Sequence, residues 1–164
     1  AAYAMNKYEK LKDEGVKLGF VCSCWDLMHA GHCLFIEDAK KQCHYLIAGL
    51  QTDPTSDRPH KNKPILSLEE RKIILASNRH VDEIVMYETE VDLAAALEKI
   101  RPDVRVLGSD YYLIDNGSPS YFTGSGTEKE VYYHDRSKHG WSTSEIRKRI
   151  FRAELNKGNG IKAS

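Results

Sequence analysis

The sequence predicts an α/β fold of the Rossmann-like, doubly wound type: a mainly parallel five-stranded sheet with helices on both faces. Two observations support this prediction. Short apolar runs alternate along the chain with helical patterns, which is the arrangement of βαβ units. In addition, the run YLIAGL at 45–50 is almost continuously apolar, as expected for a parallel strand that is covered on both sides.

Each expected element rests on its own local pattern. We expect strands at 16–22, 45–50, 83–87, 104–107 and 130–133, and helices at 6–14, at 32–43, from 67 onward, at 91–100 and at 143–157. The leading helix ends at Gly15, and in the second helix apolar residues recur every three or four positions. The third helix begins at Ser67, which has capping-box spacing to Glu70, and the Ala-rich fourth helix stops before Pro102.

The chain is expected to form one domain over residues 1–164, because this length suits a single core. We interpret residues 1–15 either as a leader or as a segment that is partly derived from an expression tag. Residues 158–164 are expected to form a loose tail. Residues 109–129 contain Gly, Ser, Asn and Pro with little periodicity, so we expect a long loop there, which is a candidate lid.

Charge and apolar content argue against several classes of partner. Lys plus Arg and Asp plus Glu number 24 each, and a formal net charge of zero argues against a broad nucleic-acid surface. No apolar run approaches the roughly 20 residues that a membrane span needs. The four cysteines lie between positions 22 and 43, so none is left to bridge a distant loop. We therefore expect reduced thiols and a cytoplasmic protein.

The most informative stretch is VKLGFVCSCWDLMHAGH at 16–32, in which a strand turns sharply into a helix. His29 and His32 stand at the helix start, with Gly31 between them. The free N–H groups and the dipole of a helix start favour a phosphate there, and Gly31 allows the backbone to approach it. Imidazoles can also donate hydrogen bonds to an α-phosphate as charge builds up during an in-line displacement. We therefore predict a phosphate site.

Two other interpretations of this stretch compete with the phosphate site. Cys22 and Cys24 are able to ligate zinc together with His29 and His32. Their C-x-C spacing, however, is tighter than the usual two to four intervening residues, which disfavours a structural zinc site. Alternatively, the two histidines merely cap the helix.

The stretch CWDLMHAGH resembles the signature G-T-F-D-x-x-H-x-G-H of the cytidylyltransferase family, whose members have the HxGH nucleotidyltransferase fold. The resemblance extends over residues 19–150. It implies transfer of CMP from CTP to a phosphorylated small molecule such as glycerol 3-phosphate, with release of pyrophosphate and help from Mg²⁺. It also implies a homodimer. Catalytic roles fall on His29, His32, Lys61 and Lys63.

Further motifs follow in the order of this family. They are Lys61-Asn62-Lys63 before an S-x-E-x-R helix, the segment RHVDE at 79–83, the turn GSDY at 108–111, and the segment GWSTS at 140–144. The resemblance assigns nucleotide binding to Gly31, Arg71, Arg79, Gly108, Asp110, Arg136, Trp141, Ser142 and Thr143. Independently of the family, Ser142 and Glu145 have capping-box spacing at a helix start that suits β- and γ-phosphates. Arg136 lies one residue further from the glycine than usual, and Lys138 is the alternative cation.

The first motif departs from the family at three positions. Ser23 and Cys24 stand where the family has Gly-Thr, and Trp25 replaces Phe. By position, the resemblance still assigns Ser23, Cys24, Trp25 and Asp26 to nucleotide binding. Asp26 matches the family residue, and we expect it to order the turn or to hold Mg²⁺.

Two rival functions stay open at this point. An adenylyltransferase that uses ATP with heptose phosphate or FMN shares the turn and the helix-start histidines. The loop DRPHKNKP at 57–64 and the region around Arg136 favour CTP over ATP. The second rival is a module that binds a nucleotide or zinc without turnover.

Overall fold

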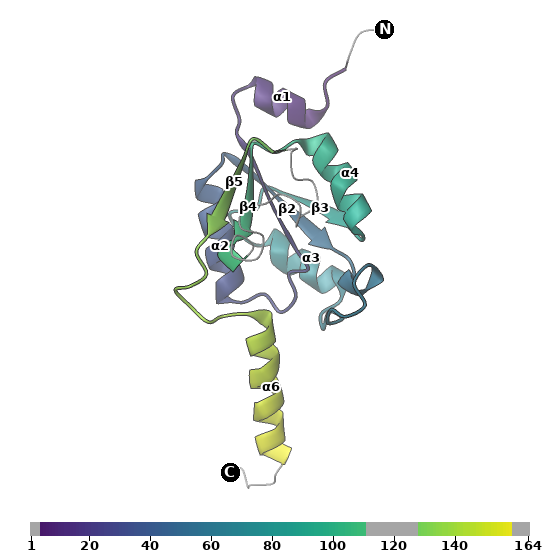
Figure 1. Ribbon diagram of the computed structural model, residues 1–164, viewed down its shortest axis with the longest axis vertical. Helices are drawn as coiled ribbons and strands as arrows, with labels where there is room; N and C mark the ends of the chain where they lie inside the picture. The colour runs from purple at the N-terminus through teal and green to yellow at the C-terminus, as the bar shows by residue number, and fades with distance from the viewer. Residues whose placement is uncertain (1–3, 111–127, 159–164) are drawn as a thin grey trace.

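The computed structural model describes residues 4–110 and 128–158, which form one sheet flanked by helices (Figure 1). The strands are β1 (Leu18–Ser23), β2 (Tyr45–Gln51), β3 (Glu83–Tyr87), β4 (Val104–Gly108) and β5 (Glu130–His134). The helices are α1 (Lys7–Asp13), α2 (Ala30–Lys41), α3 (Leu68–Ala76), α4 (Glu90–Ile100) and α6 (Thr143–Gly158), with a short 3₁₀ turn at Pro54–Ser56. The strand order is β3-β2-β1-β4-β5, and all neighbouring strands are parallel. The predicted fold is confirmed.

The order of the strands reverses next to β1. From β1 the chain builds outward through β2 to β3, and it then returns to place β4 and β5 on the other side of β1. In open parallel sheets, ligands bind beyond the carboxyl ends of the strands at such a switch point. The topology therefore predicts a ligand site beyond Ser23 and Gly108, the last residues of β1 and β4.

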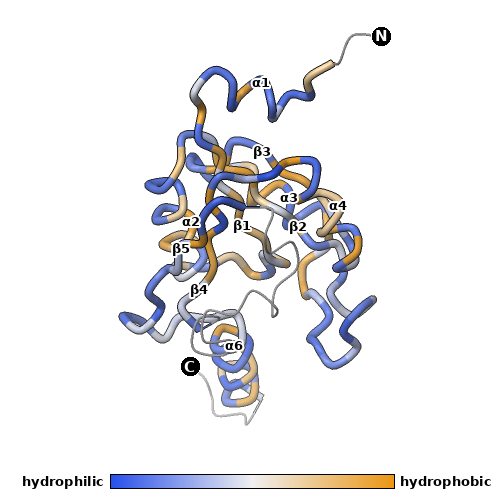
Figure 2. The backbone as a smooth tube through the Cα atoms, turned by 45° about the horizontal axis from the view of Figure 1, so that its top comes forward, coloured by the Kyte–Doolittle hydropathy of each residue, from blue (hydrophilic) through white to orange (hydrophobic). Residues whose placement is uncertain are grey.

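Helices cover both faces of the sheet, and each face has its own apolar core. Alternate residues of a strand point to opposite faces, so Val21 packs with α2 and α3, whereas Phe20 packs with α1 and α4. In Figure 2 hydrophobic segments gather along the strands, and hydrophilic ones form the outer loops. The two cores hold the sheet in place from both faces, and the loops at its carboxyl edge extend from this packed sheet.

The first strand begins two residues later than the predicted 16–22, because α1 ends in a Schellman motif. Gly15 has a φ of 84°, and its N–H donates to the Lys12 carbonyl over 2.9 Å. The Val16 N–H donates back to the Leu11 carbonyl over 3.0 Å. Val16 therefore completes the cap of α1 instead of joining β1.

The helix α6 extends away from the body of the protein (Figure 1), and none of its residues is buried. In residues 4–110 and 128–158, the helices lack the combination of length and apolar character that a bilayer span requires. The predicted loop at 109–129 lies outside the described residues from 111 to 127, as do the ends of the chain at 1–3 and 159–164.

Candidate active site

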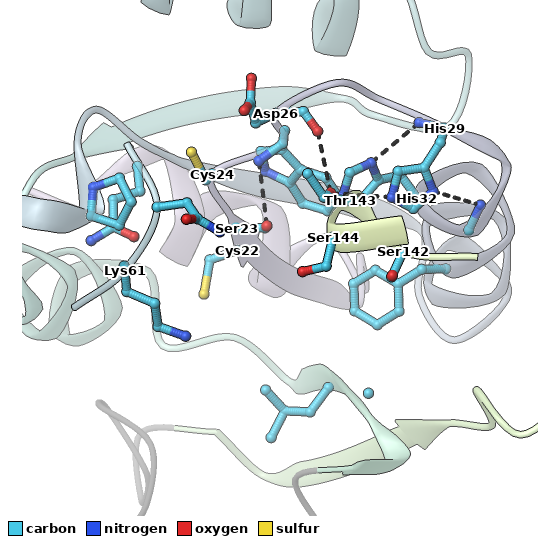
Figure 3. Close-up of a pocket in the computed structure, with 18 of the residues that line it drawn as sticks. Cys22, Ser23, Cys24, Asp26, His29, His32, Lys61, Ser142, Thr143 and Ser144 are labelled. Atoms are coloured by element: carbon cyan, nitrogen blue, oxygen red, sulfur yellow. Dashed lines mark hydrogen bonds between the residues drawn. The ribbon is translucent and has the colours of Figure 1, made fainter. Parts of the chain in front are cut away.

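A cavity of about 680 Å³ lies beyond the carboxyl ends of the strands (Figure 3). Its walls come from the turn after β1, the loop after β2, the end of β4, and the segment between β5 and α6. The residues assigned from the sequence that line it are Ser23, Cys24, Trp25, Asp26, His29, Gly31, His32, Lys61, Gly108, Arg136, Trp141, Ser142 and Thr143. Segments that are far apart in the sequence thus meet at one site.

The turn between β1 and α2 is tight although it contains no glycine before Gly31. Trp25 and Leu27 have φ values of 53° and 49°, in the left-handed region that L residues rarely adopt. The indole of Trp25 holds this shape, because it is 1% exposed and its Nε1 donates to the Gly49 carbonyl over 2.8 Å. Ser23, which stands where the family has glycine, accepts the Trp25 N–H through its Oγ at 3.3 Å. Trp25 therefore anchors the turn in the core.

His29 and His32 cap the start of α2 reciprocally. The Gly31 N–H donates to Nδ1 of His29 over 3.0 Å, and the His29 N–H donates to Nδ1 of His32 over 3.3 Å. The two rings are stacked, with their centroids 3.9 Å apart. Because both Nδ1 atoms accept hydrogen bonds, each neutral ring carries its proton on Nε2. Capping and a role in catalysis are therefore compatible, because capping occupies Nδ1 and leaves the Nε2–H groups to act as donors.

Both imidazoles are held uncharged at neutral pH. The pKa of His32 is lowered to about 3, mainly by burial and to a smaller extent by the neighbouring His29 and Arg136. Burial also lowers the pKa of His29, with a smaller contribution from Arg136. The pair is consequently suited to donate hydrogen bonds to a phosphate without changing its own protonation state.

Two glycines allow neighbouring groups to approach the backbone closely. A Cβ on Gly31 would lie 2.9 Å from the Trp141 carbonyl oxygen, so a side chain there would push α2 away from the segment before α6. A Cβ on Gly108 would lie 2.8 Å from Cδ of Arg136 and would also clash with the Asp110 carboxylate. Gly108 thus makes room for Arg136 at the edge of the cavity, where Nη1 of Arg136 lies 3.4 Å from Oδ1 of Asp110.

The start of α6 forms a second polar wall next to the histidine pair. Oγ1 of Thr143 lies 3.2 Å from Nε2 of His29 and 3.4 Å from the Asp26 carbonyl oxygen, so it links α6 to the turn after β1. The Glu145 N–H donates to Oγ of Ser142 over 3.1 Å, which confirms half of the expected capping box. Two helix N-termini, those of α2 and α6, therefore meet at one place, and each favours an anion.

Basic side chains that the sequence reasoning missed also line the cavity. Arg105 is the second residue of β4, is 3% exposed, and places Nη2 3.7 Å from Sγ of Cys22. Arg58 follows β2, where Nη2 donates to Oε1 of Gln51 over 3.3 Å. The signal for Arg105 was a single charge within the otherwise apolar strand VRVLG. In the view of Figure 3, Lys61 lies across the cavity from the histidine pair, with the end of β1 between them.

Comparison with known proteins agrees with this geometry. Residues 20–149 match the cytidylyltransferase-like family. The chain belongs to this family. It is 32% identical over 145 residues to the bifunctional protein HldE of Helicobacter pylori strain HPAG1, a match that covers 88% of this chain and 30% of that protein. It is 36% identical over 101 residues to HldE of Mesorhizobium japonicum, covering 61% of this chain and 20% of HldE. The chain therefore spans only a fifth to a third of the length of these relatives.

Solved structures share the fold. The lipopolysaccharide core biosynthesis protein of Thermoplasma volcanium GSS1 superposes with a TM-score of 0.60 at 23% identity, covering 73% of this chain and 98% of that chain. The pantoate-beta-alanine ligase of Francisella tularensis superposes with a TM-score of 0.52 at 18% identity, covering 88% of this chain and 74% of that chain. The segment that matches the family signature therefore follows a strand of a sheet that these structures share.

Arg71, which the family resemblance assigned to nucleotide binding, does not line the cavity. Its guanidinium is buried and donates to the carbonyl oxygens of Cys24 (3.0 Å), Gln51 (2.6 Å), Thr52 (2.6 Å) and Leu66 (3.2 Å). These carbonyls belong to the ends of β1 and β2 and to the segment before α3. Arg71 therefore ties together the loops that form the cavity wall and does not face the cavity.

Three other assigned residues also lie outside the cavity wall. Arg79 precedes β3 and is exposed, so it stands at the amino edge of the sheet, opposite the site. Lys63 does not line the cavity, although its neighbour Lys61 does. Asp110 does not line it either, and its carboxylate pairs with Arg136. Sequence spacing alone did not separate these residues from those that line the cavity.

The Asp26 carboxylate has a clear structural role. It is 7% exposed, and its two oxygens accept the backbone N–H groups of Ile65 and Leu66 over 2.8 and 2.9 Å. This confirms that Asp26 orders the turn, while its binding of Mg²⁺ stays a prediction. In the described parts of the chain, no three His, Cys, Asp or Glu side chains converge as a metal site would require. The zinc interpretation of Cys22, Cys24, His29 and His32 therefore finds no support in this geometry.

The depressed histidine pKa values predict a loss of stability in mild acid. In the unfolded chain His32 takes up a proton near pH 6.5, whereas the folded protein resists this until about pH 3. The unfolded state therefore binds more protons below pH 6.5, and the free energy of unfolding should fall by about 2 kcal/mol between pH 7.5 and 5. Urea denaturation at both pH values measures this change, and His32→Asn should reduce it. An identical pH slope in both proteins would contradict the assignment.

Proposed function

We propose that this protein transfers CMP from CTP to a phosphorylated small molecule, with glycerol 3-phosphate as the first candidate, and releases pyrophosphate. The observation that carries the proposal is the stacked, uncharged pair of His29 and His32 beside the start of α6. Two helix N-termini and two Nε2–H donors in one cavity suit the oxygens of a nucleoside triphosphate.

In the proposed reaction, an oxygen of the acceptor phosphate attacks the α-phosphorus of the nucleotide in line. The new P–O bond forms as the bond to the bridging oxygen breaks, and its electrons leave with pyrophosphate. His29 and His32 donate Nε2–H groups to the non-bridging α-oxygens, where negative charge concentrates. Arg136 and the start of α6, with Ser142 and Thr143, hold the β- and γ-phosphates. No side chain needs to form a covalent intermediate.

We propose that Mg²⁺ enters as part of the metal–nucleotide substrate. This ion is typically held by one or two carboxylates together with substrate phosphates, so the protein need not supply a complete ligand cage. The described residues fit that mode better than a resident metal, since they bring no three ligand side chains together. Removal of Mg²⁺ by EDTA is accordingly expected to stop turnover and to leave the fold intact. The homodimer implied by the family also stays a prediction.

A second candidate is adenylyl transfer from ATP to a sugar phosphate. The observation that favours it is the set of relatives, which includes the HldE proteins and a protein named for lipopolysaccharide core biosynthesis. Both candidates use the same phosphate site, and they differ in the base and the acceptor.

A pyrophosphate-release assay separates the candidates. The protein is incubated with Mg²⁺ and either CTP or ATP against glycerol 3-phosphate, ethanolamine phosphate, choline phosphate and heptose phosphates. Release that requires CTP and one of the first three acceptors supports the proposal. Release that requires ATP and a sugar phosphate supports the second candidate, and no release with any pair contradicts both.

The two lysines of the loop after β2 provide a matched pair of variants. Lys61 lines the cavity, whereas Lys63 does not. We expect Lys61→Ala to raise KM for the acceptor roughly tenfold, because one charge-assisted contact to phosphate is lost. Lys63→Ala should change KM less than twofold. Equal effects in steady-state kinetics would show that the loop acts only through its overall charge.

A further inference from the structure

Beyond the histidine pair, the cavity wall carries four rings from three segments, which we call the ring pocket: Phe35 of α2, His134 at the end of β5, and His139 and Trp141 before α6. The rings of His139 and Trp141 are stacked with centroids 5.0 Å apart, and Trp141 is 47% exposed. The edge of His134 meets Phe35 at 5.5 Å between centroids, and His139 lies at 6.4 Å. Such a set of planar rings suits another flat, aromatic group.

A carboxylate fixes the tautomer of His134. Oδ2 of Asp38 lies 2.7 Å from Nδ1 of His134, and Oδ1 of Asp38 accepts the Tyr132 hydroxyl over 3.3 Å. A carboxylate can only accept hydrogen bonds, so Nδ1 must carry the proton. In the neutral ring, Nε2 then carries no proton and can only accept a hydrogen bond.

That acceptor is unsatisfied in this structure. His134 is 8% exposed, and its Nε2 is buried without a hydrogen-bond partner among residues 4–110 and 128–158. A buried polar atom without a partner destabilises a protein, and the residue that carries this one lines the cavity.

We propose that the ring pocket receives the base of the nucleotide and that Nε2 of His134 accepts a hydrogen bond from its exocyclic amino group. Cytosine and adenine carry this donor, whereas uracil and guanine present a carbonyl oxygen at the corresponding position. His134 therefore selects amino-bearing bases, and Asp38 acts as its positioning residue. This inference rests on the proposed nucleotidyl transfer. It adds that His134 is the residue that recognises the base.

The test compares nucleotide affinities in the absence of acceptor, by calorimetry with Mg²⁺ at pH 8.5. The unmodified protein should bind CTP roughly tenfold more tightly than UTP, or ATP more tightly than GTP by a similar factor, because a carbonyl oxygen cannot donate to Nε2. If CTP and UTP bind more tightly than ATP and GTP, the ratio of affinities is that of CTP to UTP. Otherwise it is that of ATP to GTP.

Asp38→Asn is the decisive variant. An amide can present either an acceptor or a donor to Nδ1, so both tautomers of His134 become available. The ratio of affinities should then fall below about threefold. Tyr132→Phe, which removes the other hydrogen bond of Asp38 but keeps the carboxylate, should retain the tenfold ratio. His134→Leu, which has no acceptor at all, should also lose the ratio.

The outcomes separate this inference from the proposed function. If no nucleotide binds, both fail. If nucleotides bind but the ratio is close to one in the unmodified protein, or stays unchanged in Asp38→Asn and His134→Leu, the phosphate site stands and the role of His134 is overturned. A ratio that is lost in these two variants and kept in Tyr132→Phe supports the inference.

Discussion

We expect His32→Ala to lose a factor of roughly 100 to 1,000 in kcat, with a small change in KM for the nucleotide. The reason is that its Nε2–H acts where charge develops in the transition state, and loss of one such preorganised donor typically has this effect. The fold should survive, because the variant loses one capping hydrogen bond, worth about 1 kcal/mol. Steady-state kinetics and thermal unfolding measure the two effects separately.

His80→Ala provides the control. His80 precedes β3, at the amino edge of the sheet, and its Nε2 lies 3.9 Å from Glu37, outside the cavity wall. We expect its kcat to match that of the unmodified protein. Near-normal turnover in His32→Ala would remove the histidine pair from the mechanism.

The largest effect on stability is expected from Arg71→Met. The buried guanidinium donates to four backbone carbonyls, and the variant leaves those acceptors without their partner. We expect the free energy of unfolding to fall by roughly 3–5 kcal/mol, since unpaired buried polar groups each cost about 1–3 kcal/mol. The urea midpoint at constant m-value reports this loss.

Lys72→Met is the matched control, because Lys72 is the next residue of α3 and is exposed. It should change stability by no more than about 0.5 kcal/mol. A loss below about 1 kcal/mol in Arg71→Met would mean that water replaces the guanidinium at these carbonyls, and that the loops do not depend on Arg71.

The features that could be predicted from the sequence depend on local pattern. Capping chemistry places the starts of helices, as the Ser67 and Glu70 pair of α3 shows. Parallel strands bring their carboxyl ends to one edge, which is why His29, Lys61 and Thr143 line one cavity. Each of these three residues follows a strand, and that position is visible in the order of the residues.

The features that escaped prediction depend on packing between distant segments. Arg71 and Lys61 are both cations near β2, but the guanidinium of Arg71 turns inward to four carbonyls that no spacing rule identifies. Trp25 replaces a smaller ring and becomes the anchor of the turn through Gly49, which is 24 residues away. The partnership of Asp38 with His134 spans 96 residues, so neither residue was recognisable in the sequence alone.

The most direct test of the account follows the α-phosphorus itself. CTP labelled with ³²P at the α-position is incubated with Mg²⁺ and the acceptor that supports pyrophosphate release, and the products are separated. The account predicts that the label moves into a new diphosphate-linked product in step with unlabelled pyrophosphate, and only when the acceptor is present. Label that remains in CTP, or that appears as free CMP without acceptor, would contradict cytidylyl transfer by this protein.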